Sequence, residues 1–328
     1  MTVTNTLRID FGEPAAECRR GEFTAELDLV HCGRTRLQIG YELAGPEGAP
    51  LLLVAGGISA SRHTISNADE TLDGWWQVQS STLSRHRLLS IDWVGADGEL
   101  DRPIDASDQA RAFLAAMDAL HLETAAAFVG ASYGAMAGMH CVALAPNRVR
   151  ALLAISAAHR PHPFVSAQRA LQRQAIELGE RLGAPEAGVA LARKLAILTY
   201  RTPQEFAARF DEPISLEQDR LSVNAEAYLD HMGAQHSARM NAVGYRRLSE
   251  SIDLHRIDPD TIGVPSTFVA VLSDQLIPAE DVELLARAVP GSRLIQIPSL
   301  YGHDAFLKED EEIAGIISTF LNSLEQQQ

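Results

Sequence analysis

The chain has 328 residues, 46% of them hydrophobic, and its 28 basic and 43 acidic side chains give a formal net charge of −15. A chain of this length can bury a full core without disulfides or a structural metal, so we expect two domains or one large α/β domain. So acidic a surface argues against nucleic acid and anionic membranes as the main partners.

The cysteines and the N-terminal residues indicate an intracellular protein. Cys18, Cys32 and Cys141 are few, odd in number and form no C-x-x-C motif, which is not typical of a disulfide framework. The first residues lack the basic segment and apolar run of a signal peptide. The longest apolar stretches, 51–58 and 151–158, are shorter than the ~18–20 residues that span a bilayer. We therefore expect a cytoplasmic enzyme without membrane contact.

In the first half of the chain, short apolar segments alternate with amphipathic ones. Strand–helix–strand alternation of this kind predicts a mostly parallel, doubly wound sheet with helices on both faces. In chain order we expect strands at 36–43, 50–55 and 88–93, a helix at 106–120, a strand at 125–129, a helix at 133–144 and a strand at 149–156.

After Pro163 the pattern becomes helical, with no convincing strand as far as residue 253. The helices expected there are 165–182, 185–200, 203–210, 225–240 and 244–252. Strand patterns return at 264–272 and 293–297, and a last helix is expected at 304–324. The predicted organisation is an α/β core, residues 1–163 and 254–328, interrupted by an inserted helical cap, residues 164–253.

The strongest local motif is G-A-S-Y-G at 130–134, between a predicted strand and a predicted helix. A G-x-S-x-G turn of this kind places the serine on strained backbone and lifts its hydroxyl above the sheet, while the glycines allow strand and helix to approach closely. The context favours Ser132 as a nucleophile over a simple small-residue junction.

A serine nucleophile needs a histidine base that is oriented by a carboxylate. Asp274 follows the strand expected at 264–272, and His303 follows the next strand, 29 residues later. This order and these strand ends are typical of Ser–Asp–His hydrolase folds. A glycine-rich turn at 55–59 follows an early strand, so we expect the backbone N–H groups of Ile58 and Tyr133 to form an oxyanion hole.

These residues and three further strings resemble the homoserine O-acyltransferases of the α/β-hydrolase fold. The strings are G-H-D-A-F-L at 302–307, A-R-K-L-A-I-L-T-Y-R-T at 192–202 and Q-R-Q-A-I at 172–176. The resemblance implies that Ser132 accepts an acyl group from acyl-CoA and that homoserine then attacks the acyl-enzyme. It also implies that Arg193 binds the amino-acid carboxylate, that Asp304 binds the ammonium group, and that the chain forms a homodimer.

The acyl donor depends on regions where the chain departs from the common family pattern. The elbow reads A-S-Y-G-A at 131–135, and the early loop reads G-I-S-A at 57–60. That loop, with A-A-H-R-P-H-P at 157–163, is similar to a subgroup that uses succinyl-CoA. Succinyl carries a carboxylate that is costly to bury unpaired. Candidate partners are Arg62, His63, Arg160 and Arg169, and Leu276 is expected to border the acyl site.

The expected partners are therefore L-homoserine and succinyl-CoA, with acyl-CoA as co-substrate, no permanently bound cofactor and no metal. Acetyl-CoA as donor and serine as acceptor stay open as alternatives. A plain esterase is an alternative in a different class, and a non-catalytic ligand sensor is disfavoured because all three triad residue types are present. No G-x-G-x-x-G or P-loop motif occurs, so the only nucleotide expected is the adenosine part of CoA.

Overall fold

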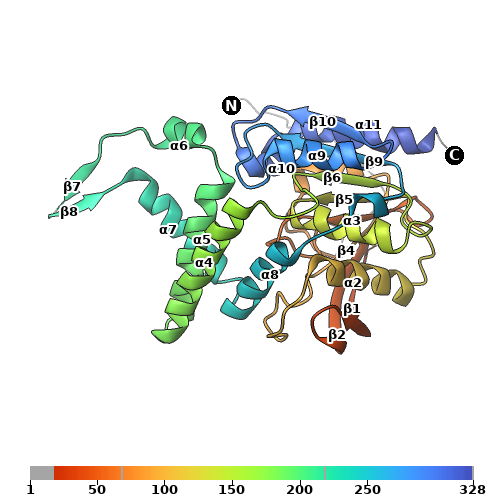
Figure 1. Cartoon of the computed structure of the whole chain (residues 1–328), viewed down its shortest axis with the longest axis horizontal. Helices are drawn as coiled ribbons and strands as arrows, with labels where there is room; N and C mark the ends of the chain where they lie inside the picture. Colours follow the sequence, from red (N-terminus) through yellow and green to blue (C-terminus); the bar gives the residue numbers. More distant parts are fainter. Residues whose placement is uncertain (1–17, 68, 218, 327–328) are drawn as a thin grey trace, which may run out of the picture.

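An eight-stranded sheet crosses the molecule in the order β1-β2-β4-β3-β5-β6-β9-β10 (Figure 1). The structure, a computed structural model, describes residues 18–67, 69–217 and 219–326. The strands are β1 (Cys18–Leu29), β2 (Gly33–Ala44), β3 (Leu51–Ala55), β4 (Arg87–Ile91), β5 (Ala127–Ala131), β6 (Leu152–Ile155), β9 (Ser266–Val271) and β10 (Arg293–Ile297). The pairs β1–β2 and β2–β4 are antiparallel, and the pairs from β4 to β10 are parallel.

Both faces of the sheet are covered, which confirms the doubly wound α/β prediction. Successive residues of β3 alternate between two hydrophobic clusters: Leu53 and Ala55 belong to one, Leu52 and Val54 to the other. Helices α2 (Ala106–Ala119), α3 (Tyr133–Leu144) and α9 (Ala279–Ala288) pack on the first cluster, and α11 (Asp310–Glu325) packs on the second. A strand that is buried on both faces has a continuous run of apolar residues. This is why β3 and β5 could be predicted from the sequence.

Among the described residues between β6 and β9, five α-helices lie in the segment for which a cap was predicted. They are α4 (Pro163–Arg181), α5 (Pro185–Tyr200), α6 (Pro203–Phe210), α7 (Asn224–Ser237) and α8 (Ala242–Leu254). The expectation that this segment contains no strand is wrong, because β7 (Ser215–Glu217) and β8 (Arg220–Ser222) pair as an antiparallel hairpin. Strands of three residues are too short to show an alternating pattern. Figure 1 shows the hairpin projecting away from the sheet.

The end of the chain also differs from the single helix expected at 304–324. A 3₁₀ turn, Gly302–Asp304, leads into the short helix α10 (Ala305–Lys308), and α11 begins after Glu309, whose ψ of 66° breaks the helix. The remaining short elements are η1 (Gln77–Gln79), α1 (Ser80–Leu83) and η2 (Pro259–Thr261). Within the described ranges, none of the helices has both the length and the apolar character to cross a bilayer.

Candidate active site

Ser132 occupies the sharp turn between β5 and α3. Its φ is 54° and its ψ is −122°, a conformation that is strained for a residue with a side chain. A Cβ on Gly130 would lie 2.6 Å from the Gly134 carbonyl oxygen, and one on Gly134 would lie 2.2 Å from the Ala55 carbonyl oxygen. Only glycine fits at these two positions, so the residue types of the motif follow from this close approach of strand, turn and helix.

The structure brings Ser132, His303 and Asp274 together in a hydrogen-bonded series. His303 Nε2 lies 2.7 Å from Ser132 Oγ, and His303 Nδ1 lies 2.7 Å from Asp274 Oδ2. The second carboxylate oxygen of Asp274 accepts hydrogen bonds from the amides of Leu276 (2.8 Å) and Ile277 (2.9 Å). Because an ionised carboxylate can only accept, Nδ1 carries the proton in this pair and Nε2 is left to accept from the serine hydroxyl.

His303 and Asp274 are both almost completely buried, at 3% and 5% exposure. Burial by itself lowers the pKa of the His303 imidazole, but the Asp274 carboxylate outweighs it and raises that pKa above its ordinary value of 6.5. The raised pKa means that Asp274 stabilises the imidazolium that forms when Ser132 gives up its proton.

The peptide between Gly57 and Ile58 is oriented by two donors. The Gly57 carbonyl accepts hydrogen bonds from the Ala60 amide (2.9 Å) and the Trp93 indole Nε1 (3.0 Å). Since N–H and C=O point in opposite directions across a trans peptide, the Ile58 N–H points away from Trp93. Among the described residues, neither the Ile58 nor the Tyr133 amide donates a hydrogen bond, so both are available to an oxyanion.

Trp93 was not predicted as part of the site. It follows β4 and packs edge-on against the ring of Tyr133, with ring centroids 4.8 Å apart. Trp93 thus contacts the peptide that carries the Ile58 N–H, through the Gly57 carbonyl, and the side chain of Tyr133. No sequence motif around Trp93 indicates that its side chain would contact these residues.

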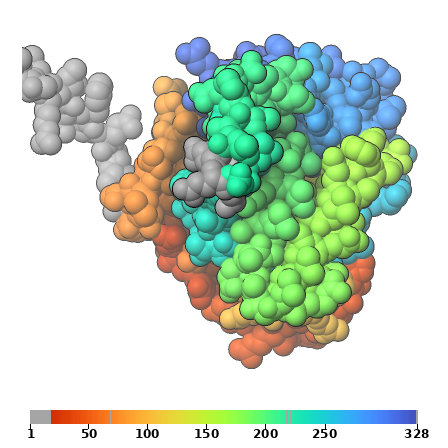
Figure 2. Space-filling view, turned by 90° about the vertical axis from the view of Figure 1, so that its left-hand side faces the viewer, coloured from red at the N-terminus to blue at the C-terminus, as the bar shows by residue number. Residues whose placement is uncertain are grey.

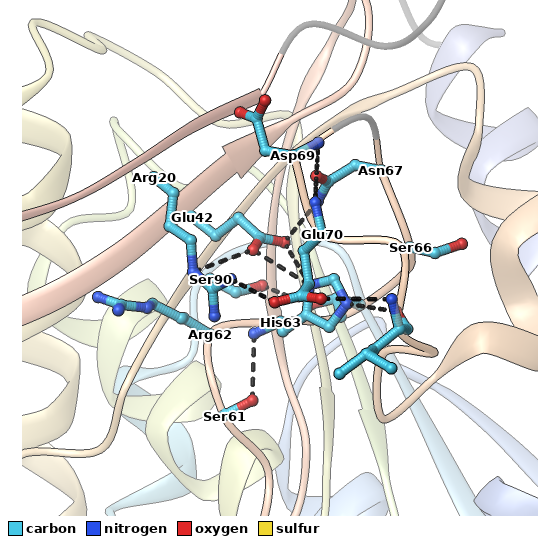
Figure 3. Close-up of polar contacts among 12 residues, drawn as sticks. Arg20, Glu42, Ser61, Arg62, His63, Ser66, Asn67, Asp69, Glu70 and Ser90 are labelled. Carbon is cyan, nitrogen blue, oxygen red and sulfur yellow. Dashed lines mark hydrogen bonds and ion pairs between the residues drawn. The ribbon is translucent and has the colours of Figure 1, made fainter.

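A buried polar cluster anchors the loop that follows Ile58 (Figure 3). His63 Nδ1 lies 3.1 Å from both carboxylate oxygens of Glu42 on β2, and His63 Nε2 lies 2.8 Å from the Leu72 carbonyl oxygen. Asn67 also donates to Glu42, at 3.1 Å. Burial raises the pKa of the Glu42 carboxyl, although His63 and Arg20 act in the opposite direction. His63 therefore has partners for both ring nitrogens and is not free to bind a ligand.

Arg193 and Tyr200, both on α5, lie beside the triad. The Arg193 guanidinium carbon is 5.2 Å from the centroid of the Tyr200 ring, which is 6.0 Å from the centroid of the His303 ring. Arg193 Nε is buried without a hydrogen-bond partner in the described part of the chain. Asp304, next to His303, forms an ion pair with Arg201 at 2.8 Å. A guanidinium that has one buried N–H without a partner is suited to a carboxylate ligand.

A cavity of about 860 Å³ opens beside these residues. Its lining includes Ile58, Trp93 and Arg193 but none of the three triad residues. The cavity therefore lies next to the oxyanion loop and outside the hydrogen-bonded series. Across residues 18–67, 69–217 and 219–326, no cluster of three or more His, Cys, Asp or Glu side chains could hold a metal ion.

The structure places only one of three further residues expected near the acyl group next to the triad. Leu276 is buried and its amide is bonded to Asp274. Arg62 forms an ion pair with Asp92 at 3.4 Å and donates to the Gly21 carbonyl at 3.1 Å. Arg160 is exposed. Of these three, the structure joins only Leu276 to the triad.

Known proteins with similar sequences or structures share this fold. A family model described as alpha/beta hydrolase fold matches residues 49–310. The chain is 44% identical to a homoserine O-succinyltransferase of Xanthomonas campestris pv. campestris, over 98% of the chain and 89% of that protein. It is 35% identical to a homoserine O-acetyltransferase of Thermus thermophilus, over 67% of the chain and 58% of that protein. The solved structure of homoserine O-acetyltransferase from Bacillus anthracis has the same fold, with a TM-score of 0.84 at 15% identity, covering 93% of this chain and 98% of that one.

Proposed function

The chain belongs to the homoserine O-acyltransferases of the α/β-hydrolase fold, and we propose that it transfers a succinyl group from succinyl-CoA to the hydroxyl of L-homoserine in methionine biosynthesis. The observation that carries this proposal is the 44% identity to a homoserine O-succinyltransferase along 98% of the chain. It is supported by the 2.7 Å contacts that join Ser132, His303 and Asp274.

In the first half-reaction, Ser132 is the nucleophile. His303 Nε2 takes the proton from Ser132 Oγ, which attacks the thioester carbonyl carbon. The negative charge that develops on the carbonyl oxygen is stabilised by the N–H groups of Ile58 and Tyr133. The carbon–sulfur bond then breaks, the CoA sulfur takes the proton from His303, and a succinyl ester on Ser132 remains.

In the second half-reaction, homoserine replaces CoA. His303 takes the proton from the homoserine hydroxyl, whose oxygen attacks the ester carbonyl. The bond to Ser132 Oγ breaks, and the proton returns from His303 to the serine. Arg193 binds the homoserine carboxylate and Asp304 its ammonium group, which orients the hydroxyl toward the ester. The segment 163–254 limits access of water, because hydrolysis of the acyl-enzyme would waste the donor.

The test is release of CoA thiol from succinyl-CoA and acetyl-CoA, each with homoserine, with serine and without an acceptor. We expect sustained release over many turnovers only when homoserine is present, with succinyl-CoA as the better donor. Sustained release without an amino acid, beyond the first turnover, would instead indicate an esterase. A preference for acetyl-CoA or for serine would correct the donor or the acceptor and leave the reaction type intact.

The proposal for Arg193 predicts a selective effect on the second half-reaction. Arg193→Met is expected to raise the KM for homoserine about 100-fold, because a bidentate charge-assisted contact is lost. The first turnover of CoA release, measured by stopped flow without homoserine, is expected to change less than threefold. Lys194→Met is the matched control, since Lys194 is the next residue on α5 and pairs with Asp230. An equal loss in both half-reactions would contradict the role of Arg193.

The contact between Trp93 and the Gly57 carbonyl predicts a positioning role. Trp93→Phe removes the hydrogen bond from the indole N–H to the Gly57 carbonyl. We expect kcat to fall about tenfold, because the Ile58 N–H is then oriented less firmly toward the oxyanion. We expect little change in KM, because the substitution removes no contact with the substrate. Trp75→Phe is the control, because Trp75 Nε1 has no hydrogen-bond partner in the described structure. Similar kinetics for the two variants would show that the Trp93 N–H does not position the oxyanion donor.

We propose that the chain forms a homodimer through the segment 163–254. Two helices there carry apolar stripes on their exposed sides: Phe164, Leu171 and Leu178 on α4, and Leu191, Leu195 and Leu198 on α5. Both helices run across the face seen in Figure 2. Stripes of this kind on a folded protein favour a protein interface.

The homodimer predicts twice the chain mass of 35.6 kDa in light scattering. The double variant Leu171→Asp, Leu178→Asp is expected to have the mass of a single chain, because it places charges on the α4 stripe. Leu284→Asp, at an exposed position of α9, is expected to keep the mass of the parent. A double variant that is still dimeric would exclude α4 from the interface.

We also propose that acyl-CoA acts only as a co-substrate, without a permanently bound cofactor, and that the enzyme works in the cytoplasm. The support for the location is that Cys18, Cys32 and Cys141 are all free thiols, as in proteins of a reducing compartment.

A further inference from the structure

A buried glutamate on β2 meets a buried histidine on the loop after Ile58 (Figure 3). Glu42 is 3% exposed and His63 is 8% exposed. His63 Nδ1 lies 3.1 Å from each carboxylate oxygen of Glu42, and His63 Nε2 lies 2.8 Å from the Leu72 carbonyl oxygen. Both ring nitrogens of His63 therefore face oxygens of groups that ordinarily accept hydrogen bonds.

These contacts fix the number of protons that the two side chains hold. The Leu72 carbonyl can only accept, so Nε2 carries a proton. The contact with Glu42 needs a second proton, either on Nδ1 facing an ionised carboxylate or on the carboxyl group facing the bare nitrogen. Burial, the largest influence on the Glu42 carboxyl, raises its pKa, while His63, Arg20 and Arg62 act in the opposite direction. Glu42 and His63 thus share one proton in the structure.

The charged groups around this pair are themselves paired. Arg20 on β1 bonds to Glu70 (3.1 Å) and lies 3.7 Å from Glu42, and Arg62 pairs with Asp92 (3.4 Å). Two further titratable groups lie nearby, the exposed Asp69 and the Cys18 thiol, whose pKa burial raises to about 11. Since these neighbours offset one another, the contact between Glu42 and His63 depends on the proton that they share.

The loop that His63 anchors, residues 61–67 and 69–76, packs against the oxyanion turn. The Trp75 amide donates to the His63 carbonyl (3.1 Å). A Cβ on Gly56 would lie 2.8 Å from Trp75 Cζ3, so the indole ring lies directly against Gly56. Gly56 is two residues before Ile58, whose N–H is an expected oxyanion donor. The anchored loop therefore supports the turn that carries this donor.

The anchored loop also contacts the segment that carries the catalytic histidine. The Trp76 amide donates to the Thr64 carbonyl (2.9 Å), and the Trp76 indole Nε1 donates to the Phe306 carbonyl (2.9 Å). The Phe306 ring packs edge-on against the ring of His303, with centroids 6.0 Å apart. Displacement of this loop would disturb both the oxyanion turn and the base.

We propose that Glu42 and His63 are positioning residues whose shared proton holds the anchored loop in place, so that acylation of Ser132 fails when rising pH removes that proton. The proposal rests on the acyl transfer proposed above, in which Ile58 supplies an oxyanion N–H. It adds a pair of residues outside the triad that the reaction depends on.

Loss of the shared proton to solvent leaves a neutral imidazole beside a carboxylate. The single N–H of His63 can then point to Glu42 or to Leu72 but not to both, so one of the two contacts places a lone pair against an oxygen. A buried polar contact of this kind is costly. The anchor is therefore intact at lower pH and is lost as the pH rises.

The central variant is Glu42→Gln, which keeps both contacts without a proton to lose. Its amide N–H can donate to Nδ1, while the neutral imidazole donates from Nε2 to the Leu72 carbonyl and the amide oxygen still accepts from Asn67. The measurement is the rate of the first turnover of CoA release from succinyl-CoA, by stopped flow without homoserine. By about pH 9.5 we expect the parent rate to fall at least about tenfold below its maximum, and the Glu42→Gln rate to stay within about threefold of its own.

Two further variants separate this effect from a general loss of structure. Glu42→Leu leaves His63 Nδ1 and the Asn67 amide without an acceptor, and we expect it to lower the rate about tenfold at every pH. Glu26→Gln is the matched control on β1, where Glu26 pairs with Arg34 near the surface; it is expected to keep the profile of the parent. Thermal unfolding of each variant identifies a loss caused by misfolding.

Tryptophan fluorescence tests the anchor without any substrate. The three tryptophans of the chain are Trp75, Trp76 and Trp93, so the signal comes from the anchored loop and the residue beside the oxyanion turn. We expect the fluorescence of the parent to change with rising pH at the same midpoint as the rate of acylation. Glu42→Gln is expected to show no change at that midpoint.

Three results would overturn the proposal. They are an alkaline loss that occurs at the same pH in Glu42→Gln, an equal loss at every pH in Glu42→Gln, and a parent that keeps its full rate to about pH 9.5. A parent that releases no CoA thiol from any donor would overturn the proposed acyl transfer instead. The fluorescence titration would then still show whether Glu42 and His63 hold the loop through a shared proton.

Discussion

Replacing Ser132 by alanine is expected to lower acyl transfer at least about 10,000-fold and to abolish the burst of CoA release. Without the hydroxyl, no ester can form, and the oxyanion donors and substrate contacts alone give little rate. Mass spectrometry of the parent protein mixed with succinyl-CoA is expected to show one added succinyl group, which the variant lacks.

Ser156→Ala is the matched control for this experiment. Ser156 follows β6, the neighbour of β5, and is a buried serine that also has a positive φ, 52°. Its hydroxyl has no hydrogen-bond partner in the described structure, so its removal is expected to leave the burst intact. A burst that survives in Ser132→Ala would exclude the acyl-enzyme on this residue.

Replacing Asp274 by asparagine is expected to lower kcat/KM by about 10,000-fold, because an amide no longer holds His303 in the productive tautomer. It is also expected to shift the pH dependence. His303 acts as a base only when neutral, so activity is lost as the pH falls through its pKa, which lies above 6.5 in the parent. Without the carboxylate that raises this pKa, burial lowers it, and the acidic limb moves to lower pH.

The measurement for Asp274 is the pH profile of kcat/KM for the acyl donor, which reports the free enzyme. Asp281→Asn, on α9, is the control, because Asp281 has no contact with His303 in the described structure. It is expected to keep the position of the acidic limb. An acidic limb that stays in place in Asp274→Asn would show that another group controls the profile.

The parts of the molecule that could be predicted from sequence depend on short-range patterns. Continuous apolar runs identified β3 and β5, since a strand buried on both faces has no polar positions. The motif around Ser132 and the places of Asp274 and His303 after their strands indicated which residues would meet, because strand ends of a parallel sheet lie at one edge. In the structure these three side chains do meet.

The parts that could not be predicted depend on contacts between distant residues. The bond from Trp93 to the Gly57 carbonyl joins two loops, and the pairing of Glu42 with His63 joins a strand to a loop. In neither pair does the spacing of the two residues along the chain indicate that they are in contact.

Helix α8 is attached to the catalytic turn by the hydrogen bond between Ser251 and Tyr133. Asn241, at the start of the same helix, donates to the Asp97 carbonyl in the loop after β4. An outward movement of α8 as one body would therefore have to break a bond to the nucleophile turn and a bond to the loop after β4.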